Sequence, residues 1–178
     1  MYKMKYWLLA ARPKTLIASI APVAISSALC LRYYSFNYII FVCTLISAIL
    51  IQIMTNFIND LYDFKKGADS EHRLGPDRMI QAGNITETEM KKGIIFVLIL
   101  SILMGLYLVN IGGKIILLIG LSSFLFAYLY TATKLSIAYN GFGEIFVFLY
   151  FGIIASFGTF YLQTLELNYK VLLIGCIC

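Results

Sequence analysis

Charged residues are scarce in this sequence. Only 13% of the 178 residues are Asp, Glu, Lys or Arg, whereas 61% are hydrophobic. A soluble domain is typically about half apolar and about a quarter charged. The scarcity of charge therefore excludes an ordinary soluble domain and predicts an integral membrane protein.

Histidine and cysteine, the usual ligands of zinc, are also few. The one histidine is His72, and the four cysteines are Cys30, Cys43, Cys176 and Cys178. No cysteine has metal-ligand spacing, and all four lie in apolar segments, so we expect them to be packing residues. We expect His72 to be a solvated loop residue.

The positive charge is not gathered into a patch. The net charge is +5, but the basic residues sit at the ends of apolar runs. This pattern excludes nucleic acid as the expected partner and favours the lipid bilayer.

Apolar runs near the length needed to cross a bilayer, about 20 residues, recur along the chain. They predict an all-α fold, a polytopic transmembrane helix bundle. The five predicted spans are Thr15–Leu31, Tyr38–Ile58, Gly93–Gly113, Ile115–Thr133 and Ile145–Gln163. A sixth begins near Val171, and the residues up to Cys178 are too few to cross. We therefore expect residues 1–178 to form one membrane domain that is incomplete at its C-terminal end.

The basic residues also predict an orientation. Eleven of the 14 lysines and arginines lie before the first span, between spans two and three, or after span four. The positive-inside rule places these segments in the cytoplasm. We expect a multi-pass protein of the cell (inner) membrane with a cytoplasmic N-terminus. The loop from Asn59 to about Lys91 is long enough to indicate a function, and Thr86 to Glu89 predict a helix N-cap within it.

A polar stripe marks the end of the second predicted span. At about 100° per residue its members fall within an arc of roughly 100° on a helix. They are Gln52, Asn56, Asn59, Asp60 and Asp63. A polar stripe in a membrane helix is costly, so we expect it to face a cavity and to have a function. Acids at i and i+3, with Asp69 beyond them, suit Mg²⁺ shared with substrate phosphates.

Basic residues follow the acidic cluster. They are Lys65, Lys66, Arg73 and Arg78. They are either solvated or bound to anionic headgroups, or they grip a diphosphate beside Mg²⁺. Arg78 is the strongest candidate for the second role, followed by Lys65 and Arg73.

Two further places leave alternatives open. Arg12 and Lys14 flank Pro13 before the first span, where they either mark a helix start or reach an anionic substrate. Glu144 opens the fifth span, as a helix-capping acid or as a functional group at the membrane edge.

Several motifs match a known family. Asn59-Asp60-x-x-Asp63 with Asp69 resembles the first aspartate-rich motif of the UbiA superfamily of intramembrane prenyltransferases. Three further segments resemble one branch, the dihydroxynaphthoate polyprenyltransferases of menaquinone synthesis. They are Arg12-Pro13-Lys14-Thr15-Leu16, Gly75-Pro76-x-Arg78-x-x-Gln81-x-Gly83 and Tyr139-x-Gly141-x-Gly143-Glu144.

This resemblance implies a bundle of eight or nine spans around a lipid-accessible cavity. It implies transfer of a polyprenyl group from polyprenyl diphosphate to 1,4-dihydroxy-2-naphthoate, with decarboxylation to a demethylmenaquinol. The implied Mg²⁺ ligands are Asn59, Asp60, Asp63 and Asp69, with Asp60 and Asp63 catalytic. The implied substrate-binding residues are Asn56, Lys65, Arg73, Arg78, Arg12, Lys14 and Glu144.

The superfamily's second aspartate-rich motif is absent from this sequence. The acids after Asp77 are Glu87, Glu89, Glu144 and Glu166. We therefore expect the 178-residue chain alone to transfer no prenyl group. The alternatives are a different acceptor (a hydroxybenzoate, a haem precursor or a chlorophyll precursor), an inactive fragment, and a cation transporter. A transporter favours ionisable residues near the bilayer midplane, whereas these acids cluster at one rim.

Overall fold

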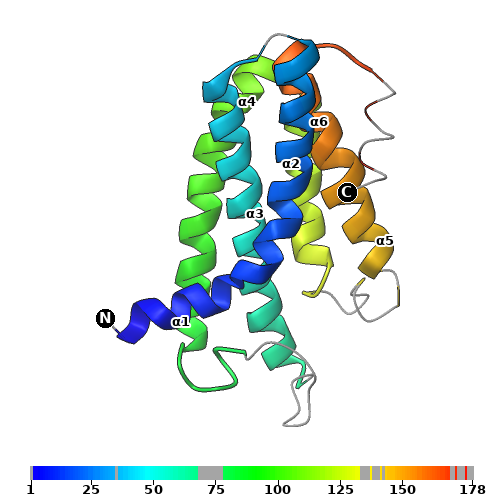
Figure 1. Ribbon diagram of the computed structural model, residues 1–178. Coiled ribbons are helices and arrows are strands. Elements are labelled where there is room, and N and C mark those ends of the chain that lie inside the picture. The colour runs from blue at the N-terminus through cyan, green and yellow to red at the C-terminus, as the bar shows by residue number, and fades with distance from the viewer. Residues whose placement is uncertain are drawn as a thin grey trace.

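The chain folds into a bundle of helices. The computed structural model describes residues 2–34, 36–67, 78–132, 137, 141, 143–168, 171 and 175, and these contain helices and no strand. In order, the helices are α1 (Tyr2–Ala11), α2 (Pro13–Tyr33), α3 (Tyr38–Lys65), α4 (Glu87–Leu129), α5 (Gly143–Val147), the π-helical η1 (Phe148–Ile154) and α6 (Ala155–Thr164). Figure 1 shows α2, α3 and α6 side by side, with α1 leaving the bundle at its lower end. The predicted all-α class is confirmed.

Local signals start the long helices. Pro13 stands at the first position of α2, where its missing N–H is not needed. The Asn37 side chain caps α3 by accepting a hydrogen bond from the Ile39 N–H at 2.9 Å. At the start of α4, the Glu89 N–H donates to the Thr86 hydroxyl at 3.2 Å, and the Thr86 N–H donates to the Glu89 carboxylate at 3.0 Å. The predicted N-cap at Thr86 is confirmed as a capping box.

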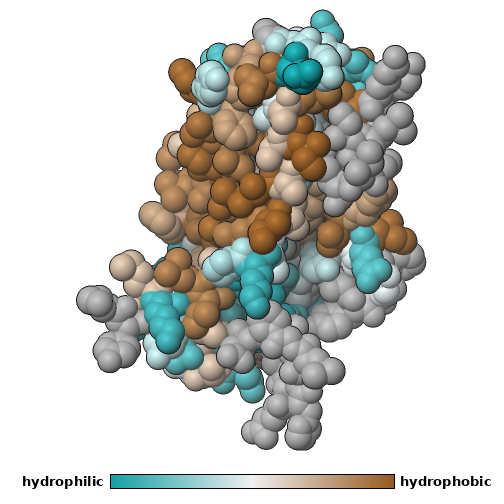
Figure 2. Space-filling model, in the orientation of Figure 1, coloured by the Kyte–Doolittle hydropathy of each residue, from teal (hydrophilic) through white to brown (hydrophobic). Residues whose placement is uncertain are grey.

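Among the described residues, four helical segments are long and apolar enough to cross a membrane. They are Pro13–Tyr33, Tyr38–Lys65, Glu87–Leu129 and Gly143–Thr164. Together with the exposed apolar side chains, they describe a multi-pass membrane protein. Figure 2 shows a broad hydrophobic band on this face with hydrophilic groups above and below it, the arrangement a bilayer favours.

The 43-residue α4 consists of two spans. A straight helix of that length would be about 65 Å long, roughly twice the hydrocarbon thickness of a bilayer. The helix breaks at Gly113, whose φ of 60° and ψ of −145° are not helical. Figure 1 shows the first limb rising and the second descending. The predicted division between Gly93–Gly113 and Ile115–Thr133 is therefore confirmed.

Helix α3 extends past the end of the second predicted span. The span was predicted to end at Ile58 and the connection to run from Asn59 to about Lys91, and this connection is shorter at both ends. The polar stripe from Gln52 to Asp63 lies on one helix, as the sequence predicts. The helix continues to Lys65 and stops where Gly67 takes a left-handed conformation with φ of 62°. It continues because buried partners satisfy its polar side chains, as described below. Residues 68–77 and most of the predicted sixth span lie outside the described residues.

Candidate active site

The end of α3 carries buried polar side chains. Asn59, Asp60 and Asp63 are 9%, 0% and 5% exposed. Buried carboxylates are rare in proteins unless they are paired or hydrogen-bonded. Each of these three residues has such a partner, and the partners come from parts of the chain that are distant in sequence.

Asp63 pairs with Arg78. The guanidinium Nη2 of Arg78 donates to Oδ2 of Asp63, and the two side chains are only 4% and 7% exposed. Removing one member of a buried ion pair costs about 3–5 kcal/mol, because the other charge is left uncompensated. The structure thus brings together Arg78, the strongest basic candidate from the sequence, and Asp63, one of the two acids expected to be catalytic.

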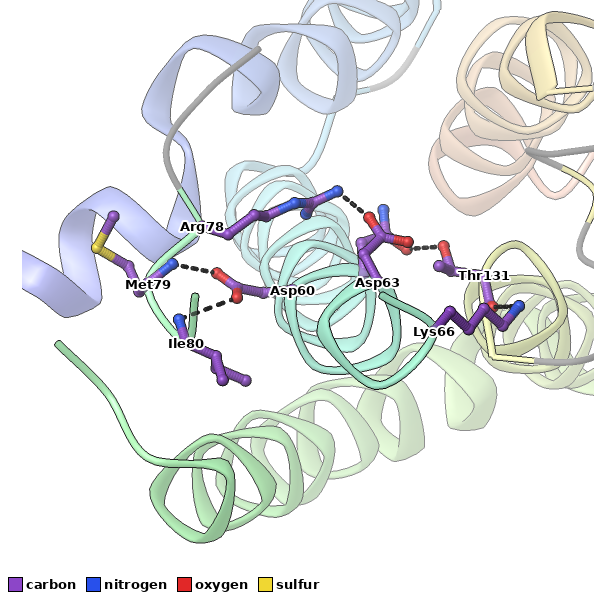
Figure 3. A network of polar contacts seen from close by, with 8 residues as sticks. Asp60, Asp63, Lys66, Arg78, Met79, Ile80 and Thr131 are labelled. Atoms are coloured by element: carbon purple, nitrogen blue, oxygen red, sulfur yellow. Dashed lines mark hydrogen bonds and ion pairs between the residues drawn. The ribbon is translucent and has the colours of Figure 1, made fainter. Parts of the chain in front are cut away.

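Asp60 faces the backbone of the segment that carries Arg78. Its Oδ2 accepts a hydrogen bond from the Met79 N–H at 3.0 Å, and its Oδ1 accepts one from the Ile80 N–H at 3.2 Å. Figure 3 shows Asp60 and Asp63 leaving α3 in different directions, with Arg78 reaching across the helix to Asp63. Two separate attachments therefore hold this segment against α3.

Asn59 contacts the end of α4. The Thr131 hydroxyl donates to Asn59 Oδ1, and the Lys66 ammonium donates to the Thr131 backbone carbonyl. Thr131 is 2% exposed. These bonds tie the last turn of α3 to the descending limb of α4, and they fix the orientation of the Asn59 amide.

Further along the stripe, Asn56 holds the turn between α1 and α2. Its Nδ2 donates to the Ala11 carbonyl at 2.8 Å and to the Thr15 hydroxyl at 3.0 Å. The residue between them, Arg12, has a left-handed backbone with φ of 52°, and the Thr15 hydroxyl donates to its carbonyl at 3.0 Å. Left-handed backbone is unfavourable for a residue with a side chain, so these bonds stabilise the position of Arg12.

An apolar cavity of about 720 Å³ opens beside the stripe. It is lined by residues of α2, α3, both limbs of α4, α5, η1 and α6. Most of its lining is aliphatic or aromatic, and its polar lining includes Arg12, Gln52, Asn56 and Asn59. Of the described motif residues, Asn59 lines the cavity, whereas Asp60 and Asp63 do not. The predicted cavity beside the polar stripe is confirmed.

Aromatic rings gather on one wall of this cavity. The ring centroid of Phe126 lies 4.9 Å from that of Phe146 and 4.5 Å from that of Tyr150. Tyr150 belongs to η1, and π-helical turns are frequent at functional sites. Tyr130 also lines the cavity.

The sequence matches a family model. The description of that model is UbiA prenyltransferase family, and the match covers residues 19–178. This chain belongs to the UbiA prenyltransferase family. The resemblance found in the motifs is thereby confirmed.

Curated relatives within the UbiA family carry one recurring name. The 1,4-dihydroxy-2-naphthoate octaprenyltransferase of Haemophilus influenzae is 36% identical, over 96% of this chain and 58% of the relative. The proteins of the same name from Escherichia coli and Bacillus subtilis are 35% and 36% identical, over 97% and 92% of this chain. The chain covers 58% and 53% of those two relatives, so it spans a little over half the length of the proteins it matches.

The other predicted site residues lie apart from the cluster or outside the described residues. Lys14 and Glu144 are exposed, Glu144 in the first turn of α5. Lys65 is also exposed, and its Nζ lies 5.3 Å from the centroid of the Tyr62 ring. Asp69 and Arg73 fall in the segment that the structure does not describe. The roles assigned to these five residues stay predictions.

Several site residues were missed by the sequence interpretation. Thr131 and Tyr130 carry no motif of their own, and Met79 and Ile80 take part only through their backbone N–H groups. No pattern in the sequence distinguishes them. The nearest signal is the position of Thr131 at the end of an apolar run, on the same predicted side of the membrane as the aspartates.

The donor atoms of the cluster fit a hard cation. Asn59 and Asp63 stand four residues apart on one face of α3 and offer amide and carboxylate oxygens. Mg²⁺ binds through one or two carboxylates, with water and phosphate oxygens completing its shell. In the described part of the chain, no three acidic, histidine or cysteine residues form a metal-binding group. A Mg²⁺ ion here would therefore depend on phosphate or on residues such as Asp69.

Proposed function

We propose that this chain acts in the transfer of a polyprenyl group from a polyprenyl diphosphate to an aromatic acceptor. We further propose that the acceptor is 1,4-dihydroxy-2-naphthoate, in menaquinone biosynthesis. The observation that carries the proposal is the buried group of Asn59, Asp63 and Arg78, whose member Asn59 lines an apolar cavity. The names of the UbiA relatives support the choice of acceptor.

The two ends of the site suit the two ends of the donor. An isoprenoid chain is apolar and flexible, and the aliphatic and aromatic lining of the cavity would remove it from water. A diphosphate is a dense anion, and Arg78 offers it charge-assisted hydrogen bonds from a planar guanidinium. Arg12, which lines the cavity, would add positive charge at the same end.

Magnesium is the cofactor we propose for this site. Asn59 and Asp63 would hold it, and Asp69 is a candidate for a further ligand. When bound, the ion would offset negative charge that builds up on the departing diphosphate.

The residues of the site promote departure of the diphosphate. As the allylic C–O bond breaks, its electron pair leaves with the diphosphate oxygen, toward the guanidinium of Arg78. The allylic carbon becomes electron-poor, and the faces of Phe126, Phe146 and Tyr150 offer it negative electrostatic potential. The electron-rich acceptor ring then forms the new C–C bond through the carbon that bears its carboxylate. The bond from this carbon to the carboxylate breaks, carbon dioxide leaves, and the electron pair of the broken bond restores the aromatic ring. The water-poor cavity protects the reactive cation from hydrolysis.

The proposed orientation places the site at the cytoplasmic rim of the cell membrane. The predicted cytoplasmic segments include the N-terminus and the residues that follow span two, and both ends of α4 lie beside them. Lys3 pairs with Glu89 at one end of α4, and Asn59 pairs with Thr131 at the other. Diphosphates and Mg²⁺ are plentiful on the cytoplasmic side.

Donor binding tests the proposal directly. The chain in lipid nanodiscs is titrated with tritiated geranylgeranyl diphosphate, with Mg²⁺ or with excess EDTA. We expect saturable binding of the donor, and we expect pyrophosphate to compete with it. EDTA should lower the affinity for the donor by roughly tenfold or more. We expect Asp63→Asn to weaken binding similarly, whereas Glu166→Gln, which also removes one carboxylate, leaves it unchanged. Donor binding that is insensitive to both EDTA and pyrophosphate would contradict the proposal.

Two further measurements separate the alternatives. With donor bound, dihydroxynaphthoate is expected to bind more tightly than hydroxybenzoate, and the reverse order would indicate another acceptor. In proteoliposomes without diphosphate, we expect no cation flux. A flux that Asp63→Asn removes would favour the transporter.

A further inference from the structure

Asp60 is engaged on a different side of α3 from its neighbours in the motif. At about 100° per residue, it lies roughly 100° around the helix from Asn59 and roughly 60° from Asp63. Asn59 and Asp63 are only about 40° apart. Asn59 lines the cavity, whereas Asp60 is fully buried beneath the Arg78–Ile80 segment. Asp60 therefore points to a different side of the helix from Asn59.

The contacts of Asp60 are those of an anchor. Each of its two carboxylate oxygens accepts a backbone N–H, from Met79 and from Ile80. Hydrogen bonds of ionised carboxylates to backbone N–H groups are among the stronger ones in proteins. Met79 and Ile80 are 2% and 6% exposed, so without Asp60 their N–H groups would be buried with no alternative from water.

The anchored segment carries the basic residue of the site. Arg78 directly precedes Met79 in sequence, and its side chain extends from this point across α3 to Asp63 (Figure 3). A shift of the backbone at Met79 would move the start of the Arg78 side chain by a similar distance. Arg78 Nη2 can contact Asp63 because the hydrogen bonds of Asp60 fix the position of this segment on α3.

We propose that Asp60 is a positioning residue that binds the backbone of Met79 and Ile80 and thereby holds the Arg78 guanidinium beside Asp63, and that it is not a metal ligand. This assignment differs from the metal-ligand role predicted for Asp60 from the sequence. The importance of Arg78 for a diphosphate rests on the proposed function. The anchoring of the segment does not.

Amide exchange tests the anchor without any substrate. The chain in nanodiscs is compared with Asp60→Asn, which keeps the side-chain volume but places an NH₂ group opposite one of the two N–H donors. Hydrogen–deuterium exchange is followed at Met79 and Ile80. We expect Asp60→Asn to speed their exchange by roughly tenfold or more, and Asp63→Asn to change it much less.

Metal and pyrophosphate binding test the second half of the proposal. Mn²⁺ affinity is measured by electron paramagnetic resonance in the absence of phosphate. We expect the affinity of Asp60→Asn to stay within about threefold of the parent chain, and that of Asp63→Asn to fall by roughly tenfold. Pyrophosphate affinity at saturating Mn²⁺ is expected to fall in Asp60→Asn. In an Arg78→Ala background the same substitution should cause no further loss, because its effect passes through Arg78.

Each result decides the matter. Faster exchange with retained Mn²⁺ affinity supports the anchor. Retained protection of Met79 and Ile80, or a loss of Mn²⁺ affinity equal to that of Asp63→Asn, overturns it. If Asp60→Asn loses the native emission of Trp7, Asp60→Glu replaces it. That variant keeps the charge, and it should speed exchange and weaken pyrophosphate binding while it retains Mn²⁺ affinity. If the parent chain binds neither Mn²⁺ nor pyrophosphate, the proposed function fails, and amide exchange still decides the anchor.

Discussion

Thr131 illustrates how a residue outside any motif can set the properties of one inside it. Its hydroxyl donates a hydrogen bond to Asn59 Oδ1. The Asn59 amide group can rotate about its side-chain bonds, and this hydrogen bond fixes the direction of the amide oxygen. Its backbone carbonyl accepts the Lys66 ammonium, which holds Thr131 in place from the other side. The orientation of the Asn59 amide therefore depends on contacts between the end of α3 and the end of α4.

This arrangement predicts the effect of Thr131→Val. The substitution preserves the shape of the side chain but removes the hydroxyl, so the Asn59 amide is free to turn. We expect the affinity for Mn²⁺ to fall on the order of tenfold, as for other residues that orient a metal ligand. Thr131→Ser keeps the hydroxyl and should retain the affinity. Equal affinities of all three proteins would show that Asn59 does not need this bond or does not bind the metal.

At the scale of single residues, the sequence carries part of the site. The four-residue spacing of Asn59 and Asp63 places them on one face of a helix, and this was predictable from local geometry. The partner of Asn59 was not, because Thr131 lies 72 residues away in sequence. The backbone partners of Asp60 lie 19 and 20 residues away. Such contacts depend on tertiary packing that no local pattern records.

At the scale of elements, an aromatic contact helps to hold α1 against the bundle. The Trp7 ring packs edge-on against Phe57, with centroids 5.3 Å apart, and it lies over Gly93 of α4. A Cβ placed on Gly93 would come within 2.6 Å of ring atoms Cη2 and Cζ3. The absence of a side chain at this position allows α1 to reach α4.

We therefore expect Gly93→Ala to displace the Trp7 ring. Trp7 is the only tryptophan in the sequence, so its fluorescence reports on this contact alone. The emission of Gly93→Ala in nanodiscs should shift to longer wavelength as the ring moves toward water or headgroups. Gly105→Ala is the matched control, because a Cβ there has no neighbour within 4 Å. The same emission from both variants would show that Trp7 adapts without leaving its place.

The boundaries of the elements were predictable to different degrees. The break at Gly113 follows from length, because an apolar run that is too long for one crossing must turn. The second predicted span ends at Ile58 because polar residues follow it, whereas the spacing of Asn59, Asp60 and Asp63 places them on the same helix. Burial against Arg78, Thr131 and the Met79–Ile80 backbone keeps them in the helix.

At the scale of the whole molecule, most of the spans contribute residues to the lining of the cavity. Gly120 lies on the descending limb of α4 and lines the cavity, and a Cβ there would have open space for at least 4 Å. Leu118 on the same limb is 67% exposed and points to the outside. A phenylalanine can therefore be introduced inside the cavity at position 120 and outside it at position 118.

We expect Gly120→Phe to shorten the isoprenoid that the chain can bind. The phenyl group would occupy apolar volume that a long chain needs, and a short chain would avoid it. Binding of geranyl diphosphate should be retained, and binding of longer polyprenyl diphosphates should weaken as their length increases. Leu118→Phe should leave the whole series unchanged. A uniform loss for all lengths would show that the substitution disturbs the fold instead.

The cavity also has a consequence for handling the protein. An alkyl tail of a detergent resembles an isoprenoid in width and polarity, and a hollow of about 720 Å³ lined mainly by hydrocarbon groups would admit one. Solubilised preparations would then contain molecules that occupy the hollow before any ligand is added. The detergent chosen for purification would thus compete with isoprenoid ligands for the cavity. A detergent whose tail is too bulky to enter would leave the cavity free for the ligand.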